Sequence, residues 1–201
     1  MPFFTKLPES VTIVTYNCNV HPKRHKPVGI LESGLTALGV PHTVLGKDMK
    51  KWNHIYKIDL LHKYLDEVKT EYVISSDSAD VFVTNRLEAI CDKFDSFGCE
   101  ALFNSEKCMS PGGIAPSFAV FEKAIHNGCF LNAGLWMART KFAKELTAYL
   151  MEIPRYYNCE QFYYKIAYKH FYPRLQVDAR SLIFQGLNHT PAKETRLVKL
   201  F

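Results

Sequence analysis

Two aspartates, Asp77 and Asp80, stand three residues apart directly after the apolar run 72–76. This run has the β-branched, apolar character of a strand buried on both faces. Ligands of open α/β sheets bind at the carboxyl ends of the strands. Two carboxylates in one tight turn there can share a hard cation such as Mg²⁺ or Mn²⁺, as an enzyme of nucleoside diphosphates requires. Aspartates that merely form the turn are the alternative interpretation, because Asp is common where strands end.

The elements before this turn alternate between strands and helices. Continuous apolar runs predict strands, and apolar residues at helical spacing predict helices. The order β-α-β-α-β is the signature of a doubly wound, right-handed parallel sheet. The predicted elements are strands at 11–16, 41–45 and 72–76 and helices at 28–38 and 56–68.

The turn that carries Asp77 and Asp80 (residues 77–80) is called the acid turn. After it, the sequence predicts a long loop at 108–119, where prolines and glycines cluster. The apolar run 130–138 predicts a strand interrupted by a small residue. No internal repeat or linker divides the chain. The fold class is therefore predicted as α/β, with a Rossmann-type, mostly parallel sheet, helices on both faces and a single domain over residues 1–201. The other predicted elements are helices at 87–97, 141–151 and 160–168 and strands at 101–103, 175–178, 181–184 and 197–201.

Further polar residues are predicted at the same edge of the sheet. Thr15 and Tyr16 end the first strand, and residues 104–106 follow a later one. Asn132 lies in an otherwise apolar strand, so its amide needs partners, and the hydroxyl groups of a sugar are such partners. Gly134 would let backbone and ligand approach closely. A hydrogen bond from Asn132 to an adjacent loop and a bulge at Gly134 are the alternatives.

Composition limits the classes of function. The chain has 201 residues, 47% hydrophobic and 22% charged, as expected for one globular domain. A net charge of +5, without a basic stripe beyond residues 47–52, disfavours nucleic acid as a partner. The six cysteines contain no CxxC pair, so free thiols are expected. The sequence shows no signal peptide and no apolar run of about 20 residues, which predicts a cytoplasmic protein without a membrane segment.

Several motifs together resemble GT-A-type glycosyltransferases. The resemblance is strongest to the glycosyltransferase domain of procollagen lysyl hydroxylases and their viral relatives. The motifs follow the same order and span nearly the whole chain, which is far more specific than one pair of aspartates. The matching segments are 11–15, 77–81, 103–106 followed by Cys108, 130–134, 161–163, and Asp178 with 183–185.

This resemblance implies a GT-A-like fold, a UDP-sugar donor and Mn²⁺ (or Mg²⁺) as cofactor. It implies that Asp77 and Asp80 bind the metal between the two phosphates. Asn132 and Gly134 are expected to face the transferred sugar, and Glu160 is expected near the acceptor and the sugar. The remaining implied site residues are Thr15, Tyr16, Lys57 and Ser78 for the nucleotide donor and Gln161, with Asn132 and Glu160, for catalysis. An ordinary solvated helix lysine is the alternative for Lys57.

Three positions depart from the family pattern. Residues 108–109 replace a bulky aromatic residue, and Cys159 replaces an acid expected before Glu160. The third metal ligand of the family is a histidine in a downstream segment, which this domain is expected to lack because residues 197–201 match the strand that precedes it. His189 is the candidate stand-in ligand. A loop histidine in a polar tail is its alternative interpretation.

The residues and the resemblance together predict a metal-dependent glycosyltransferase. It would move a hexose from a UDP-sugar to an acceptor hydroxyl of a glycan or protein, including a hydroxylysine-linked one. A sugar-nucleotide-binding module with weak or no transferase activity is the first alternative. A haloacid-dehalogenase-like phosphohydrolase is the second, although that chemistry needs a nucleophilic Asp two residues before its partner rather than three.

Overall fold

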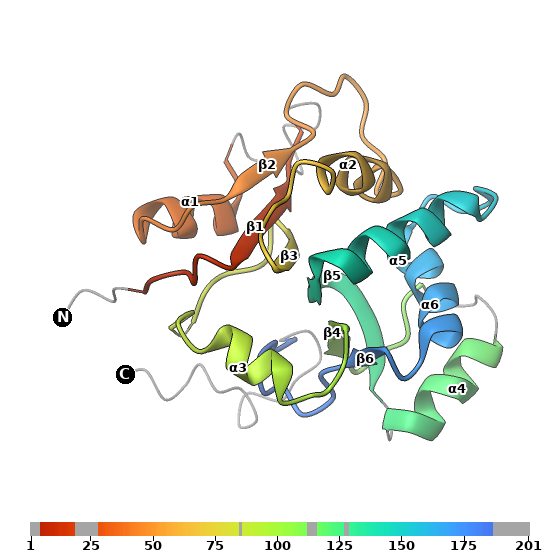
Figure 1. Cartoon of the computed structure of the whole chain (residues 1–201). Helices are drawn as coiled ribbons and strands as arrows, with labels where there is room; N and C mark the ends of the chain where they lie inside the picture. Colours follow the sequence, from red (N-terminus) through yellow and green to blue (C-terminus); the bar gives the residue numbers. More distant parts are fainter. Residues whose placement is uncertain (1–4, 19–27, 85, 112–115, 127–128, 187–201) are drawn as a thin grey trace.

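A six-stranded sheet with the order β2-β1-β3-β5-β4-β6 organises the chain (Figure 1). The computed structural model describes residues 5–18, 28–84, 86–111, 116–126 and 129–186. Five strands run in one direction, while β5 is antiparallel to both of its neighbours, β3 and β4. The strands are β1 (Val11–Tyr16), β2 (Thr43–Leu45), β3 (Tyr72–Asp77), β4 (Ala101–Glu106), β5 (Phe130–Arg139) and β6 (Leu175–Val177).

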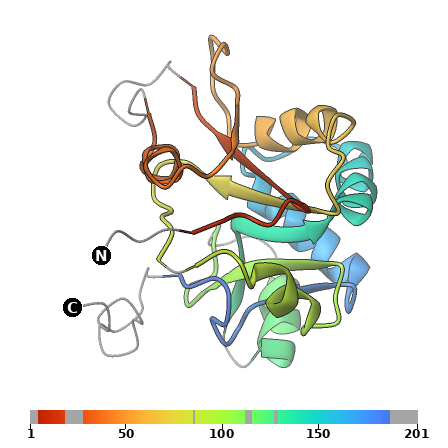
Figure 2. The ribbon, with the colours of Figure 1, turned by 60° about the vertical axis from the view of Figure 1, so that its left-hand side comes forward.

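Helices cover both faces of the sheet (Figures 1 and 2). Along β5, Trp136 and Ala138 belong to the larger core, under α2, α5 and α6. Met137 points to the opposite core, under α1 and α3, as the two-residue period of a strand requires. The helices are α1 (Ile30–Ala37), α2 (Tyr56–Tyr64), α3 (Ile90–Asp95), α4 (Pro116–His126), α5 (Thr140–Glu152) and α6 (Glu160–Phe171).

The architecture confirms the predicted α/β class, the mostly parallel sheet and the helices on both faces. The reversed direction of β5 was not anticipated from the sequence. The ladder between β4 and β5 is irregular, because Phe103 pairs with Trp136 while Asn104 pairs with Asn132. Residues 133–135 of β5 therefore bulge at this point, which agrees with the interruption predicted at Gly134.

Two predicted elements are wrong. The loop expected at 108–119 contains the start of α4, whose first residue is Pro116, where the missing N–H of proline costs no helical hydrogen bond. Residues 181–184 form no strand. Instead, the buried carboxylate of Asp178 accepts hydrogen bonds from the N–H groups of residues 182, 183 and 184 at 2.9, 2.7 and 2.9 Å. The strand expected at 197–201 lies outside the described residues.

The cysteines and the helix lengths agree with two simpler expectations. All six cysteines are free thiols, as predicted, so covalent cross-links do not constrain the described chain. Among the described helices, none combines the length and the apolar composition needed to cross a bilayer.

The larger core predicts the response of the fold to truncation. Phe103 is fully buried and stacks on Trp136 with ring centroids 5.1 Å apart. We expect Phe103→Ala to lower the free energy of unfolding by about 3–5 kcal/mol, because it removes these contacts and leaves a cavity. Val120→Ala is the control, since Val120 is 68% exposed, and it should change stability by less than about 0.5 kcal/mol. Urea unfolding measures both, and equal losses would contradict the described core.

Candidate active site

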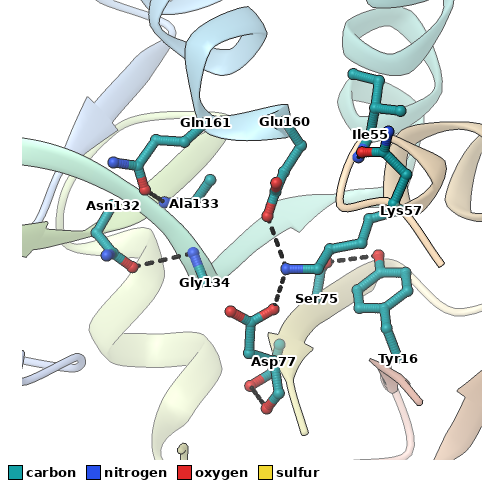
Figure 3. Close-up of polar contacts among 12 residues, drawn as sticks. Tyr16, Ile55, Lys57, Ser75, Asp77, Asn132, Ala133, Gly134, Glu160 and Gln161 are labelled. Carbon is teal, nitrogen blue, oxygen red and sulfur yellow. Dashed lines mark hydrogen bonds and ion pairs between the residues drawn. The ribbon is translucent and has the colours of Figure 1, made fainter. Parts of the chain in front are cut away.

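A buried lysine joins two acids at the carboxyl end of β3. Lys57, in the first turn of α2, contacts Oδ1 of Asp77 at the end of β3 and lies 2.7 Å from Oε1 of Glu160, the first residue of α6 (Figure 3). Lys57 is 6% exposed, so it is not a solvated surface lysine. The predicted residues Lys57, Asp77 and Glu160, which are distant in the sequence, therefore form one cluster.

The charges of this cluster depend on one another. Burial by itself lowers the pKa of Lys57, but the negative charges of Asp77 and Glu160 outweigh burial and hold that pKa above its ordinary value. The ammonium therefore stays protonated at neutral pH. Removing one partner from a buried ion pair commonly costs about 3–5 kcal/mol, because a charge is left uncompensated.

Tyr16 lies beside this cluster, and Thr15 precedes Tyr16 on β1. The Tyr16 hydroxyl and Ser75 Oγ form a buried hydrogen bond of 2.8 Å, and Lys57 Nζ lies 6.0 Å from the centre of the Tyr16 ring. Burial raises the pKa of Tyr16, so the phenol remains neutral. Thr15 is fully buried, and its Oγ1 has no hydrogen-bond partner within the described chain. Both side chains are therefore in the interior, with Tyr16 on the face of the sheet that carries Lys57 and Thr15 on the opposite face.

The start of β5 runs past the acid turn. The N–H of Gly134 donates to Oδ1 of Asn132 at 3.0 Å (Figure 3). A methyl group added to Gly134 would lie 2.9 Å from Oδ2 of Asp77 and 3.1 Å from Oδ1 of Asn132. The glycine therefore permits a close approach between the β5 backbone and the Asp77 carboxylate. The close approach of a ligand to this backbone stays a prediction.

Gln161 and Glu106 form a hydrogen-bond network around Asn132 and the β5 backbone beside it. Gln161 accepts a hydrogen bond from the N–H of Ala133 at 2.9 Å and donates to Oε1 of Glu106 and to the Ser110 carbonyl, both at 2.7 Å. Asn132 donates to Oε2 of Glu106 at 3.2 Å. The position of residue 106 at a strand end was noted in the sequence, but its bridging role between Asn132 and Gln161 was missed.

Ser78 faces inward from the acid turn. Its hydroxyl donates to Oε1 of Glu32 at 2.6 Å, and its side chain is buried. Glu32, in the first turn of α1, is a second residue that the sequence analysis missed. A glutamate inside an amphipathic helix gives no sign in the sequence that it will be buried beside a turn 46 positions downstream.

Asp77 and Asp80 have the chemistry expected of ligands for a hard cation. Asp80 is exposed, and desolvation by the surrounding protein, followed by the negative charge of Asp77, raises its pKa. Repulsion between two such carboxylates is relieved when they share a divalent cation, so these residues fit Mn²⁺ or Mg²⁺. Within the described part of the chain, no group of three or more His, Cys, Asp or Glu forms a metal-binding cluster. His189, the predicted third ligand, lies outside the described residues.

A family model supplies the assignment that the geometry alone does not. The model of the PLOD GT domain matches residues 9–199, which is nearly the whole chain. The chain belongs to this family. The resemblance to the glycosyltransferase domain of procollagen lysyl hydroxylases is thereby confirmed, and the chain is a glycosyltransferase-type domain.

This PLOD GT domain is also similar, at low identity, to a much longer protein. Procollagen-lysine,2-oxoglutarate 5-dioxygenase of Drosophila melanogaster is 25% identical over 185 residues, covering 88% of this chain. The chain spans only 25% of the length of that relative.

Two solved structures are similar to this chain at low identity. A glycosyltransferase involved in the glycosylation of the major capsid of PBCV-1 is 15% identical, with a TM-score of 0.49 over 83% of this chain and 81% of that one. The 2-C-methyl-D-erythritol 4-phosphate cytidylyltransferase of Thermus thermophilus is 15% identical, with a TM-score of 0.47 over 92% and 94% of the two chains. At TM-scores below 0.5, the assignment depends on the family match and not on these structures.

Replacing Gly134 tests the close approach to Asp77. We expect Gly134→Ala to weaken Mn²⁺-dependent binding of UDP at least about tenfold, because the added methyl group would displace the Asp77 carboxylate. Gly34→Ala in α1 is the matched control, since a Cβ there meets no heavy atom within 4 Å. It should leave binding unchanged and raise stability by about 0.5–1 kcal/mol. Isothermal titration checks both, and unchanged UDP affinity in Gly134→Ala would show that UDP binding does not depend on the placement of the Asp77 carboxylate.

The carboxyl group of Glu106 predicts a pH effect on stability. Burial raises its pKa above the ordinary 4.5, although hydrogen bonds from Asn132 and Gln161 oppose the shift. An acid with a raised folded-state pKa stabilises the fold below its unfolded pKa, and this contribution is lost as the pH rises through the folded pKa. The stability of the wild type relative to Glu106→Gln should therefore fall between about pH 4.5 and neutrality. Urea unfolding at a series of pH values measures this difference, and a constant difference would contradict the assignment.

Proposed function

We propose that this PLOD GT domain transfers a hexose from a UDP-sugar to a hydroxyl group of a glycan or protein acceptor, with Mn²⁺ or Mg²⁺ bound at the acid turn. The observation that carries the proposal is the cluster of Lys57, Asp77 and Glu160 beside the bulged β5 backbone, in a chain that belongs to a glycosyltransferase family. A hydroxylysine-linked acceptor is included in this proposal because the curated relative is a procollagen-lysine enzyme.

Asp77 and Asp80 would hold the metal through carboxylate oxygens. The contact with Lys57 involves Oδ1 of Asp77, and Oδ2 lies on the side of Gly134. The bound cation would supply Lewis-acid stabilisation of the charge that develops on the departing diphosphate. Lys57 adds a second positive charge at the same end of β3, so an anionic donor would be attracted to this edge.

The other side chains would orient the donor and the acceptor. Asn132 and Gln161 are fixed by their shared partner Glu106, so their positions would be set before the sugar binds. Glu160 uses Oε1 to contact Lys57. Its Oε2 is the atom that would accept a hydrogen bond from the acceptor hydroxyl, or from the transferred sugar, and hold it in place for transfer.

A sugar-nucleotide-binding module with weak or no transferase activity is the second candidate. It is favoured by Cys159, which stands where the resemblance implies an acid. Metal-dependent release of UDP from a panel of UDP-sugars, with and without acceptor, separates the two candidates. An enzyme releases UDP under these conditions, whereas a binding module holds the donor intact.

The metal site itself is tested by charge-removing variants. We expect Asp77→Asn and Asp80→Asn each to weaken Mn²⁺-dependent binding of UDP by at least about tenfold, because each removes one anionic oxygen donor. Asp66→Asn is the control. The Asp66 side chain is 86% exposed, and its ion pair with Lys144 is long, at 3.9 Å. Isothermal titration with Mn²⁺ and UDP gives the affinities. If both site variants bind UDP as the wild type does, the proposed metal site is wrong.

A further inference from the structure

Glu32 is a buried carboxylate whose contacts converge on one end of the sheet. It is 2% exposed and lies in the first turn of α1. Its Oε1 accepts hydrogen bonds from Ser78 Oγ at 2.6 Å, from Asn17 Nδ2 at 2.7 Å and from the Gly29 N–H at 3.2 Å. Its Oε2 lies 3.7 Å from Nζ of Lys47. One carboxylate thus collects donors from four separate positions.

Ser78, between the two aspartates of the acid turn, is held on two sides by the start of α1. Its hydroxyl donates to Glu32, and its carbonyl accepts from the Leu31 N–H at 3.0 Å. The packing leaves no free space, because a Cβ on Gly29 would lie 1.6 Å from Ser78 Oγ and 2.5 Å from the Ser78 carbonyl oxygen. The middle of the acid turn therefore cannot move without displacing Glu32 and the first turn of α1.

Glu32 also connects the chain segments that follow β1 and β2. Asn17 directly follows β1, and its N–H donates to the Leu45 carbonyl at the end of β2 at 3.0 Å. Lys47 lies two residues beyond β2. The carboxyl ends of β1, β2 and β3 are thereby joined through Glu32. These are the ends at which an α/β sheet binds its ligands.

We propose that Glu32 is the positioning residue of the acid turn: by fixing Ser78 it sets the placement of Asp77 and Asp80, and with it the affinity for a divalent cation and a nucleoside diphosphate. This inference rests on the proposed function, since it concerns the same metal site. Glu32 contacts neither aspartate, so it acts through Ser78. Partners that orient metal ligands in this way typically change metal affinity about 10–100-fold when they are removed.

The test compares Glu32→Ala with Glu32→Gln. Glutamine keeps an Oε1 that can accept from Ser78, Asn17 and Gly29, whereas alanine removes the acceptor altogether. We expect Glu32→Ala to weaken Mn²⁺ binding in the presence of UDP by at least about tenfold, and Glu32→Gln to stay within about threefold of the wild type. Isothermal titration and the electron paramagnetic resonance signal of free Mn²⁺ measure the affinity without any assay of transfer.

A matched variant separates positioning from general stability. Glu122→Gln alters another buried glutamate, which is 2.9 Å from Lys165 between α4 and α6 and contacts neither Ser78 nor the acid turn. We expect this variant to lower the Tm while leaving Mn²⁺ affinity unchanged. If Glu32 had only a structural role, Glu32→Ala would likewise lower the Tm and leave the Mn²⁺ affinity unchanged. If Glu32→Ala does not fold, Ser78→Ala takes its place and should weaken Mn²⁺ binding about 3–10-fold.

Failure of this inference can be told apart from failure of the proposed function. If the wild type binds Mn²⁺ and UDP, Asp77→Asn loses that binding, and folded Glu32→Ala (or Ser78→Ala) binds as the wild type does, the positioning role is wrong. If Asp77→Asn and Asp80→Asn both bind Mn²⁺ and UDP as the wild type does, the proposed metal site is wrong, and with it the proposed function. In the Asp80→Asn background, Glu32→Ala should cost less additional affinity than in the wild type, because both changes act on the same turn. Full additivity there would also overturn the positioning role.

Discussion

This site depends on the ion pairs that the buried ammonium group of Lys57 forms with Asp77 and Glu160. Lys57 contacts one acid at the end of β3 and another at the start of α6, while its own backbone belongs to α2. Asp77 and Glu160 would repel each other without this cation, and Lys57 would lose its charge if it were buried alone. The three groups therefore require one another. Consequently, the docking of α2 and α6 at this edge of the sheet is determined by charge as well as by apolar packing.

Much of the framework could be predicted because it follows local rules. The apolar runs at β1 and β3 predict buried strands from their composition alone, and the helical spacing of apolar residues predicts α2 and α5. The end of a strand predicts where ligand chemistry gathers, and Asp77 and Asp80 are predicted as ligand residues on that ground. Asn132 is predicted from its polar side chain in an otherwise apolar strand. The start of α4 was missed, because Pro116 and the glycines before it give the same signal whether they end a loop or begin a helix.

The missed residues share a different property: their roles come from contacts between distant parts of the chain. Glu106 bridges Asn132 and Gln161 from positions 26 and 55 residues away in the sequence. Glu32 reaches Ser78 over 46 positions. Periodicity and turn chemistry describe neighbours along the chain, so they predict that a carboxylate exists but not which buried donors it will meet. Burial of a charged side chain with several donors is visible only in three dimensions.

The reversed direction of β5 brings the site together. Because β5 is antiparallel to β3 and β4, its amino-terminal end lies beside their carboxyl ends. This places Asn132 and Gly134 at the edge that carries Asp77 and Glu106. A parallel β5 would instead bring Arg139 to this edge. In the observed orientation, Arg139 lies at the opposite edge, where it forms ion pairs with Glu71 and Asp95. The polar residues at the two ends of β5 therefore find their partners only in this direction. The one antiparallel strand of the described sheet is thus the strand that completes the site.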